Sequence, residues 1–162
     1  MPNWCEGTFR VRGNLENVKR FIMNGIGEAA NDICRIKEIE PESFDCKASF
    51  EVESSFGLLW LRDTKRQFIE PREGSIINIY AVPGKANTCI FLEPFQGAWS
   101  IDEEGMRIIA KRYKIDVKAN GYESGGRFEH VVEVDSNGIY RERKYKYYAD
   151  YDWDCPMPLL GG

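Results

Sequence analysis

The feature that most constrains this chain is the alternation of polar and apolar residues in many short segments. Residues 8–12 and 46–53 alternate with a period of two, which is typical of strands that have one buried face. Other segments rich in β-branched and aromatic residues also predict strands: 58–64, 76–82, 88–93, 115–119, 128–134 and 139–148. Because their connections are short, we expect these strands to pair antiparallel.

Two segments instead show helical spacing. Asn14 is placed to cap a helix that Gly25 ends, with apolar residues on one side at Leu15, Val18, Phe21 and Ile22. Ser100 and Glu103 have the spacing of a capping box, and the helix after them has its apolar side at Met106, Ile109, Ala110 and Tyr113. Residues 27–43 fit neither pattern and stay unassigned.

This order of elements predicts an α+β fold in which two main helices pack on one face of an antiparallel sheet. We expect a ferredoxin-like arrangement with additional strands, including a hairpin of 76–82 with 88–93 around residues 83–87. Residues 1–162 are predicted to form one domain. Its tail, residues 149–162, is acidic and contains prolines, and we expect Trp153 and a leucine to dock it on the body.

Composition excludes several classes of function. The formal net charge is -4, so nucleic-acid binding would need a local basic patch. The sequence has no apolar run long enough to span a bilayer, so no membrane partner is expected. Five scattered cysteines without a Cys-x-x-Cys pair, and His130 alone, predict no metal or redox site and no disulfides. We therefore expect a cytoplasmic protein without cofactors.

Three short motifs resemble the YubB-like ferredoxin-like family of small bacterial, phage and plasmid proteins. They are the opening Met-Pro-Asn-Trp-Cys at 1–5, Phe-Gln-Gly-Ala-Trp-Ser at 95–100, and Tyr-Glu-Ser-Gly-Gly-Arg-Phe at 122–128. Glu6 and Gly7 depart from the family pattern, and the tail around Trp153 lies outside it. The resemblance implies a ferredoxin-like fold and a bacterial or mobile-element setting, and it implies no catalytic residue.

The segment 139–148 is the best candidate for a binding site. Strand alternation places Arg141, Arg143, Tyr145 and Tyr147 on one face, and Tyr140, Lys144, Lys146 and Tyr148 on the other. A row of cations and aromatic rings on an open sheet face is what binding of single-stranded nucleic acid or RNA requires. The candidate nucleic-acid-binding residues are Arg141, Arg143, Lys144, Tyr145, Lys146 and Tyr147. The competing interpretation is an edge strand that its charges protect from aggregation.

Three weaker signals in the sequence suggest other functions. Pro2 would be a general base if it were the terminal residue, and Gly161-Gly162 is an ending found in ubiquitin-like modifiers. Asp150, Asp152 and Asp154 would share one face of a strand and offer oxygen ligands to a divalent cation. Each pattern is too short to assign a site.

The sequence therefore favours a non-catalytic interaction or accessory domain with a protein partner. It assigns no catalytic residue, cofactor or metal, and it leaves enzymatic activity and oligomeric state open. The alternative is a module that binds single-stranded nucleic acid through residues 139–148.

Overall fold

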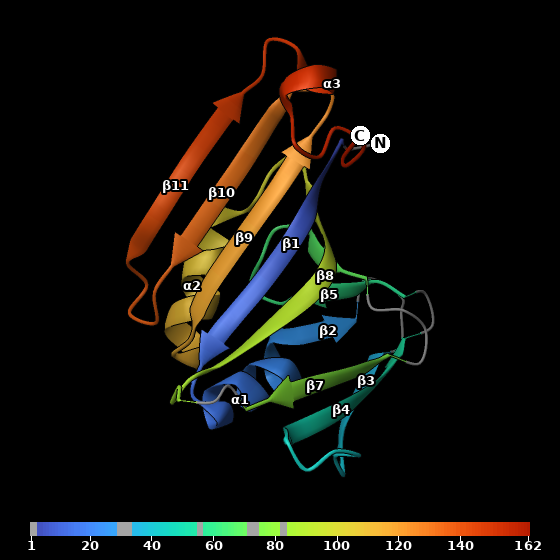
Figure 1. Cartoon of the computed structure of the whole chain (residues 1–162), viewed down its shortest axis with the longest axis vertical. Helices are drawn as coiled ribbons and strands as arrows, with labels where there is room; N and C mark the ends of the chain where they lie inside the picture. The colour runs from blue at the N-terminus through green and yellow to red at the C-terminus, as the bar shows by residue number, and fades with distance from the viewer. Residues whose placement is uncertain (1–2, 29–33, 55–56, 71–74, 82–83) are drawn as a thin grey trace.

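Two antiparallel sheets make up most of the molecule (Figure 1). The computed structural model describes residues 3–28, 34–54, 57–70, 75–81 and 84–162. The elements, in chain order, are β1 (Trp4–Gly13), α1 (Leu15–Gly25), β2 (Ile26–Glu28), β3 (Cys34–Ile39), β4 (Cys46–Ser54), β5 (Leu59–Leu61), β6 (Gln67–Ile69), β7 (Ile76–Tyr80), β8 (Thr88–Ala98), α2 (Glu103–Tyr113), β9 (Asp116–Glu123), β10 (Phe128–Val134), β11 (Tyr140–Tyr147) and α3 (Tyr151–Asp154). The larger sheet has the order β11-β10-β9-β1-β8-β6-β5-β2, and the smaller one β3-β4-β7.

The predicted ferredoxin-like α+β fold is wrong. The larger sheet has eight strands, the second sheet has three, and a third, short helix follows β11. The strands β2, β5 and β6 have three residues each, which is too short for alternation to be recognised, yet they extend the larger sheet by three places. The unassigned segment 27–43 contributes to β2 and forms β3.

The predicted hairpin between residues 76–82 and 88–93 is also wrong. Strand β7 pairs with β4 in the smaller sheet, whereas β8 pairs with β1 and β6 in the larger one. The local sequence predicts that both segments are strands, but it does not predict their partners. Pairing depends on which strand faces are buried in the same core.

One hydrophobic core holds both sheets and the two long helices together. Phe9 of β1 stacks on Phe95 of β8 at 5.9 Å between ring centroids, and Phe21 of α1 lies 6.1 Å from Phe9. Phe50 and Ile79 of the smaller sheet belong to the same cluster. The helices α1 and α2 therefore lie on one side of the larger sheet, and α2 is seen behind β9 and β10 in Figure 1.

No long helix of the described residues lies on the opposite side of the larger sheet, which we call the open face. Along β1 the core side chains alternate with Arg10 and Arg12, which are exposed on this face. Arg10 pairs in register with Lys118 of β9 and with Phe91 of β8. The open face is thus a broad surface of charged and aromatic side chains.

The C-terminal segment covers one end of the open face. Tyr151 and Cys155 are buried against Tyr122 and Tyr148, and the backbone of Gly162 exchanges hydrogen bonds of 3.0 and 3.1 Å with Trp4. The expected anchor is wrong, however, because the Trp153 side chain is 85% exposed. Leu159 is also exposed, and the half-buried Leu160 packs instead.

Some expectations lie wholly or partly outside the described residues. These concern Pro2, the first two residues of the opening motif, and residues 82–83 of the predicted hairpin. No helix in the described ranges is long and apolar enough to cross a membrane.

The first helix begins and ends as predicted, but the second has a different cap. Asn14 accepts a hydrogen bond from the backbone of Asn17 at 2.9 Å, as an N-cap does. In α2 the N-cap is Asp102, not Ser100: one carboxylate oxygen accepts from the backbone of Gly105 at 3.2 Å. The other accepts from the backbone of Lys65 at 2.7 Å, so this carboxylate also ties α2 to the segment before β6.

We therefore predict that Asp102→Ala lowers the free energy of unfolding by about 1 to 2 kcal/mol, because both N–H groups lose their acceptor. Asp152→Ala, which removes an exposed carboxylate, serves as the matched control and should change stability little. Urea denaturation measures both. Equal midpoints for Asp102→Ala and wild type would contradict this assignment of the cap.

Candidate functional site

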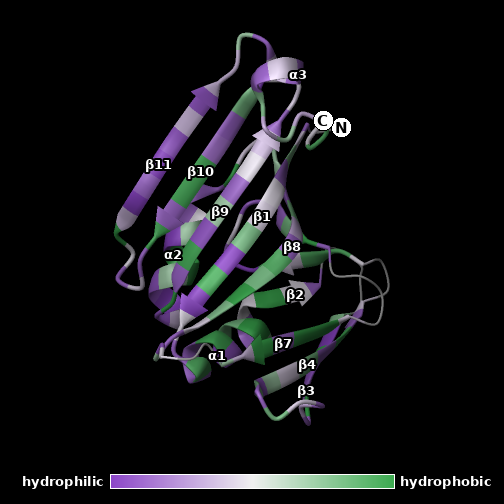
Figure 2. Ribbon diagram, in the orientation of Figure 1, coloured by the Kyte–Doolittle hydropathy of each residue, from purple (hydrophilic) through white to green (hydrophobic). Residues whose placement is uncertain are grey.

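Strand β11 is the outer strand of the larger sheet. It pairs with β10 and has no second partner among the described strands. Figure 2 shows it as a largely hydrophilic strand at one side of the molecule. The competing interpretation, an edge strand protected by its charges, places the segment in such a position.

A register shift changes the face on which the first residue of β11 lies. Glu133 lies opposite Glu142, but Val134 lies opposite Tyr140, so Arg141 falls at the irregularity. Tyr140 therefore points to the helix side, where its hydroxyl donates to the backbone carbonyl of Glu103 at 3.1 Å. The prediction that Tyr140 shares a face with Lys144 and Lys146 is wrong, because an alternation pattern cannot anticipate a bulge.

The two arginines of the predicted site are engaged by carboxylates. The Arg143 Nε lies 3.2 Å from Glu103, and its guanidinium stacks 4.8 Å above the Tyr140 ring. Arg141 forms an ion pair of 2.5 Å with Asp135. Hydrogen bonds from the backbone N–H groups of Ile139 and Asn137, together with Arg141, lower the pKa of the Asp135 carboxyl.

Tyr145 and Tyr147 form an aromatic strip on the helix side of β11. Their rings are nearly parallel, 14° apart with centroids 6.1 Å from each other, and Phe128 contacts both edge-on. The side chain of Tyr145 is 42% exposed and that of Tyr147 is 70% exposed. The strip therefore offers apolar surface to a partner at the sheet edge.

The two lysines lie on the open face. Lys146 is 4.5 Å above the ring of Tyr148, whose hydroxyl donates to Glu129 at 3.0 Å. Lys144 stands opposite Val131 in the register and is exposed. A ligand must therefore run along the edge itself to contact the tyrosines and the lysines together.

The backbone of β11 presents hydrogen-bonding groups along this edge. The N–H of Tyr148 donates to the carbonyl of Arg127 at 2.9 Å. This bond shows which residues of β11 direct their backbone groups toward β10. In an antiparallel pair, residues whose N–H and C=O groups bond to the neighbouring strand alternate with residues whose groups point away from it. The N–H and C=O groups of Arg143, Tyr145 and Tyr147 consequently face away from β10.

Behind the aromatic strip lies a buried polar group that the sequence did not identify. The His130 side chain is fully buried, and Tyr145 stacks on it with centroids 3.8 Å apart. Its Nδ1 accepts from the backbone N–H of Ile101 at 3.3 Å, so in the neutral ring the proton is on Nε2 and is donated to Glu103 at 3.2 Å. Glu103 thus joins His130 to Arg143.

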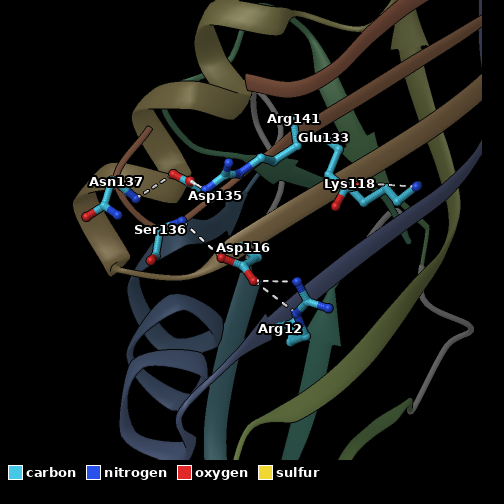
Figure 3. Close-up of polar contacts among 8 residues, drawn as sticks. All are labelled: Arg12, Asp116, Lys118, Glu133, Asp135, Ser136, Asn137 and Arg141. Carbon is cyan, nitrogen blue, oxygen red and sulfur yellow. Dashed lines mark hydrogen bonds and ion pairs between the residues drawn. The ribbon is translucent and has the colours of Figure 1, made fainter. Parts of the chain in front are cut away.

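The open face carries a second polar cluster, shown in Figure 3. Asp116 accepts from Arg12 at 2.7 and 2.9 Å and from the backbone of Ser136 at 3.0 Å. Lys118 lies 2.8 Å from Glu133. Alternation along β1 and β9 was the available signal for this cluster, since it places these side chains on one face.

The weaker sequence signals do not gather into a site. Asp150 is the N-cap of α3 and accepts from the backbone of Trp153, so the three aspartates are not on a strand. Within the described ranges no group of three or more metal-binding side chains is clustered. The backbone of Gly161 is held between Ser124 and Glu6 through hydrogen bonds of 2.8 and 3.3 Å.

Comparison with known proteins identifies no relative: no family model matches, and searches of curated proteins and of solved structures find no similar chain.

Burial makes the His130 cluster sensitive to pH. Desolvation lowers the pKa of His130 below its ordinary value of 6.5, and the nearby Glu103 only partly opposes this. When folding lowers the pKa of a histidine, the unfolded state binds the proton more tightly than the native state. The free energy of unfolding therefore decreases as the pH falls below the pKa of the unfolded state. The carboxyl groups of Asp135 and Glu104, whose pKa values are also lowered, act only in a more acidic range.

We predict that the free energy of unfolding of the wild type falls between about pH 7.5 and about pH 5.5, and that His130→Gln reduces this dependence. The variant is expected to be less stable overall, so the quantity to compare is the change with pH, measured by urea denaturation at each pH. An unchanged pH dependence would show that His130 is not the titrating group.

Proposed function

We propose that this chain is a non-catalytic interaction domain that binds an extended segment of a partner protein along the edge of β11. The observation that carries the proposal is the outward-facing backbone of Arg143, Tyr145 and Tyr147 on a strand with one described neighbour. A partner strand added there would gain main-chain hydrogen bonds, and alternate side chains would supply specificity.

The side chains around this edge define the partner's chemistry. On the helix side, the partner's residues would meet the rings of Tyr145 and Tyr147, which favour apolar side chains. On the open face they would meet Lys144 and Lys146, which favour carboxylates. The segment that fits best therefore alternates apolar and acidic residues.

Single-stranded nucleic acid is the alternative ligand of the same strand. The parallel rings of Tyr145 and Tyr147 favour it, since bases stack on such rings. Against it, Arg141 and Arg143 are already paired with Asp135 and Glu103, so few cations remain for phosphates. We place the protein ligand first for this reason.

The setting we propose is the bacterial cytoplasm, in keeping with the family that the three motifs resemble. Cys5, Cys46 and Cys155 are buried thiols, and desolvation raises the pKa of Cys5 to about 12. Unreactive buried thiols of this kind are typical of proteins from reducing compartments.

The first test is a charge swap. A capped octapeptide that alternates valine and glutamate should bind the wild type, and Lys144→Glu/Lys146→Glu should weaken it about tenfold, because two attractive pairs become repulsive. A valine–lysine octapeptide should show the opposite preference. The matched control is Lys37→Glu/Lys47→Glu, which reverses two exposed lysines on the smaller sheet.

Calorimetry or amide chemical shifts measure the affinities. Equal binding by the charge-swapped variant and wild type would contradict the proposal. A mobility shift with single-stranded oligonucleotides that weakens steeply with salt, in the absence of peptide binding, would favour the nucleic-acid alternative instead.

The second test is a proline scan of the edge. We predict that Tyr147→Pro abolishes peptide binding while the β10–β11 ladder is kept, because the lost N–H faces outward. Lys146→Pro should instead remove an inward hydrogen bond and lower the melting temperature. Tyr147→Ala separates loss of the ring from loss of the N–H. If Tyr147→Pro and Tyr147→Ala bind equally well, the peptide does not use the backbone of β11.

A further inference from the structure

A small hollow on the open face lies away from the β11 edge. Its volume is about 250 Å³, and its walls come from four neighbouring strands, β8, β1, β9 and β10. The side chains that determine its chemistry are Arg10, Arg12, Phe91, Asp116, Lys118 and Glu133. Figure 3 shows four of them together, extending over the strands on the uncovered side of the sheet.

The charges in this hollow are mostly paired. Arg12 donates twice to Asp116, and Lys118 lies 2.8 Å from Glu133 and 3.7 Å from Glu142. Arg10 has no carboxylate partner within the described residues. Three cations and two carboxylates in the lining leave one net positive charge, which belongs in effect to Arg10.

The exposed Arg10 stands beside an exposed aromatic ring. Its guanidinium lies 4.9 Å above the ring of Phe91, and that ring is 58% exposed. The register of β1 with β8 places the two residues directly opposite, so the pair is built into the sheet. A guanidinium is a fork-shaped donor that matches a carboxylate, and a phenyl ring beside it offers a surface for another ring.

We propose that the hollow binds a small aromatic monocarboxylate. The carboxylate would bind Arg10, and the ligand ring would pack against Phe91. The volume is below the usual range of about 300 to 1,000 Å³ for ligand pockets, which limits the ligand to one or two fused rings. Asp116 and Glu133 disfavour a dianion such as a phosphate monoester, because both would repel its second charge.

This inference is independent of the function proposed for β11, since none of the edge residues lines the hollow. It assigns a ligand-binding role to Arg10 and Phe91, for which the sequence offered only an alternating pattern. Binding should be weak, with a Kd of about 1 mM, because a ligand of this size makes few contacts.

The test is a titration of the full chain with naphthalene-2-carboxylate, followed by amide chemical shifts in the ¹⁵N-labelled protein. We expect saturable shifts at Arg10, Phe91 and Lys118. Arg10→Gln should weaken binding about tenfold, because a charge-assisted pair is lost. Phe91→Ala should weaken it as well, through loss of the ring surface.

The controls separate the contributions of charge, ring and fold. Lys47→Gln removes an exposed cation on the smaller sheet, outside the lining, and should bind as wild type does. The neutral alcohol 2-naphthalenemethanol should bind far more weakly, and unchanged spectra elsewhere in Arg10→Gln show that it folds. Failure to saturate, equal binding by Arg10→Gln, or displacement of the ligand by inorganic phosphate at similar concentration would each overturn the proposal.

Discussion

The packing of Phe9 against Phe21 and Phe95 is the contact on which the rest of the structure depends. It joins the central strand β1 to α1 on one side and to β8 in the sheet. Full burial of three phenyl rings contributes on the order of 1.5 to 3 kcal/mol each, and the contact decides which face of β1 is internal. Because side chains alternate along a strand, Arg10 and Arg12 are then directed to the open face. Both proposed binding surfaces follow from this choice of face.

Close approach of backbones at the centre of the sheet supports the same arrangement. A Cβ atom at Gly7 would lie 2.0 Å from the backbone carbonyl oxygen of Asn120, so only glycine allows β1 and β9 to pair as they do. The register between β1 and β8 shifts at the same place, between Gly7 and Phe9. The glycine at this position therefore has a local structural reason.

The sequence predicted individual elements much better than their assembly. The cap at Asn14 and the end of α1 at Gly25 depend on neighbouring residues, and the structure confirms them. Three-residue strands such as β5 carry too little pattern to recognise, and the partner of β7 is decided by a core that local sequence does not describe. For the site, the sequence identified the residue types of β11. It did not predict the bulge at Arg141, and Glu103, which pairs with Arg143, comes from a distant segment.

Ion pairing also decides which charges of this nearly balanced surface can recognise a ligand. Lys118 contacts Glu133 and Glu142, so its charge is used between β9, β10 and β11. Glu103 and Asp135 similarly hold Arg143 and Arg141. The cations without such a carboxylate, within the described residues, include Arg10 in the hollow and Lys144 and Lys146 at the edge. Lys118 and its partners Glu133 and Glu142 lie between Arg10 and the two lysines of the edge. The hollow and the edge therefore each have their own unpaired cations among the described residues. A substitution at one site should leave binding at the other unchanged.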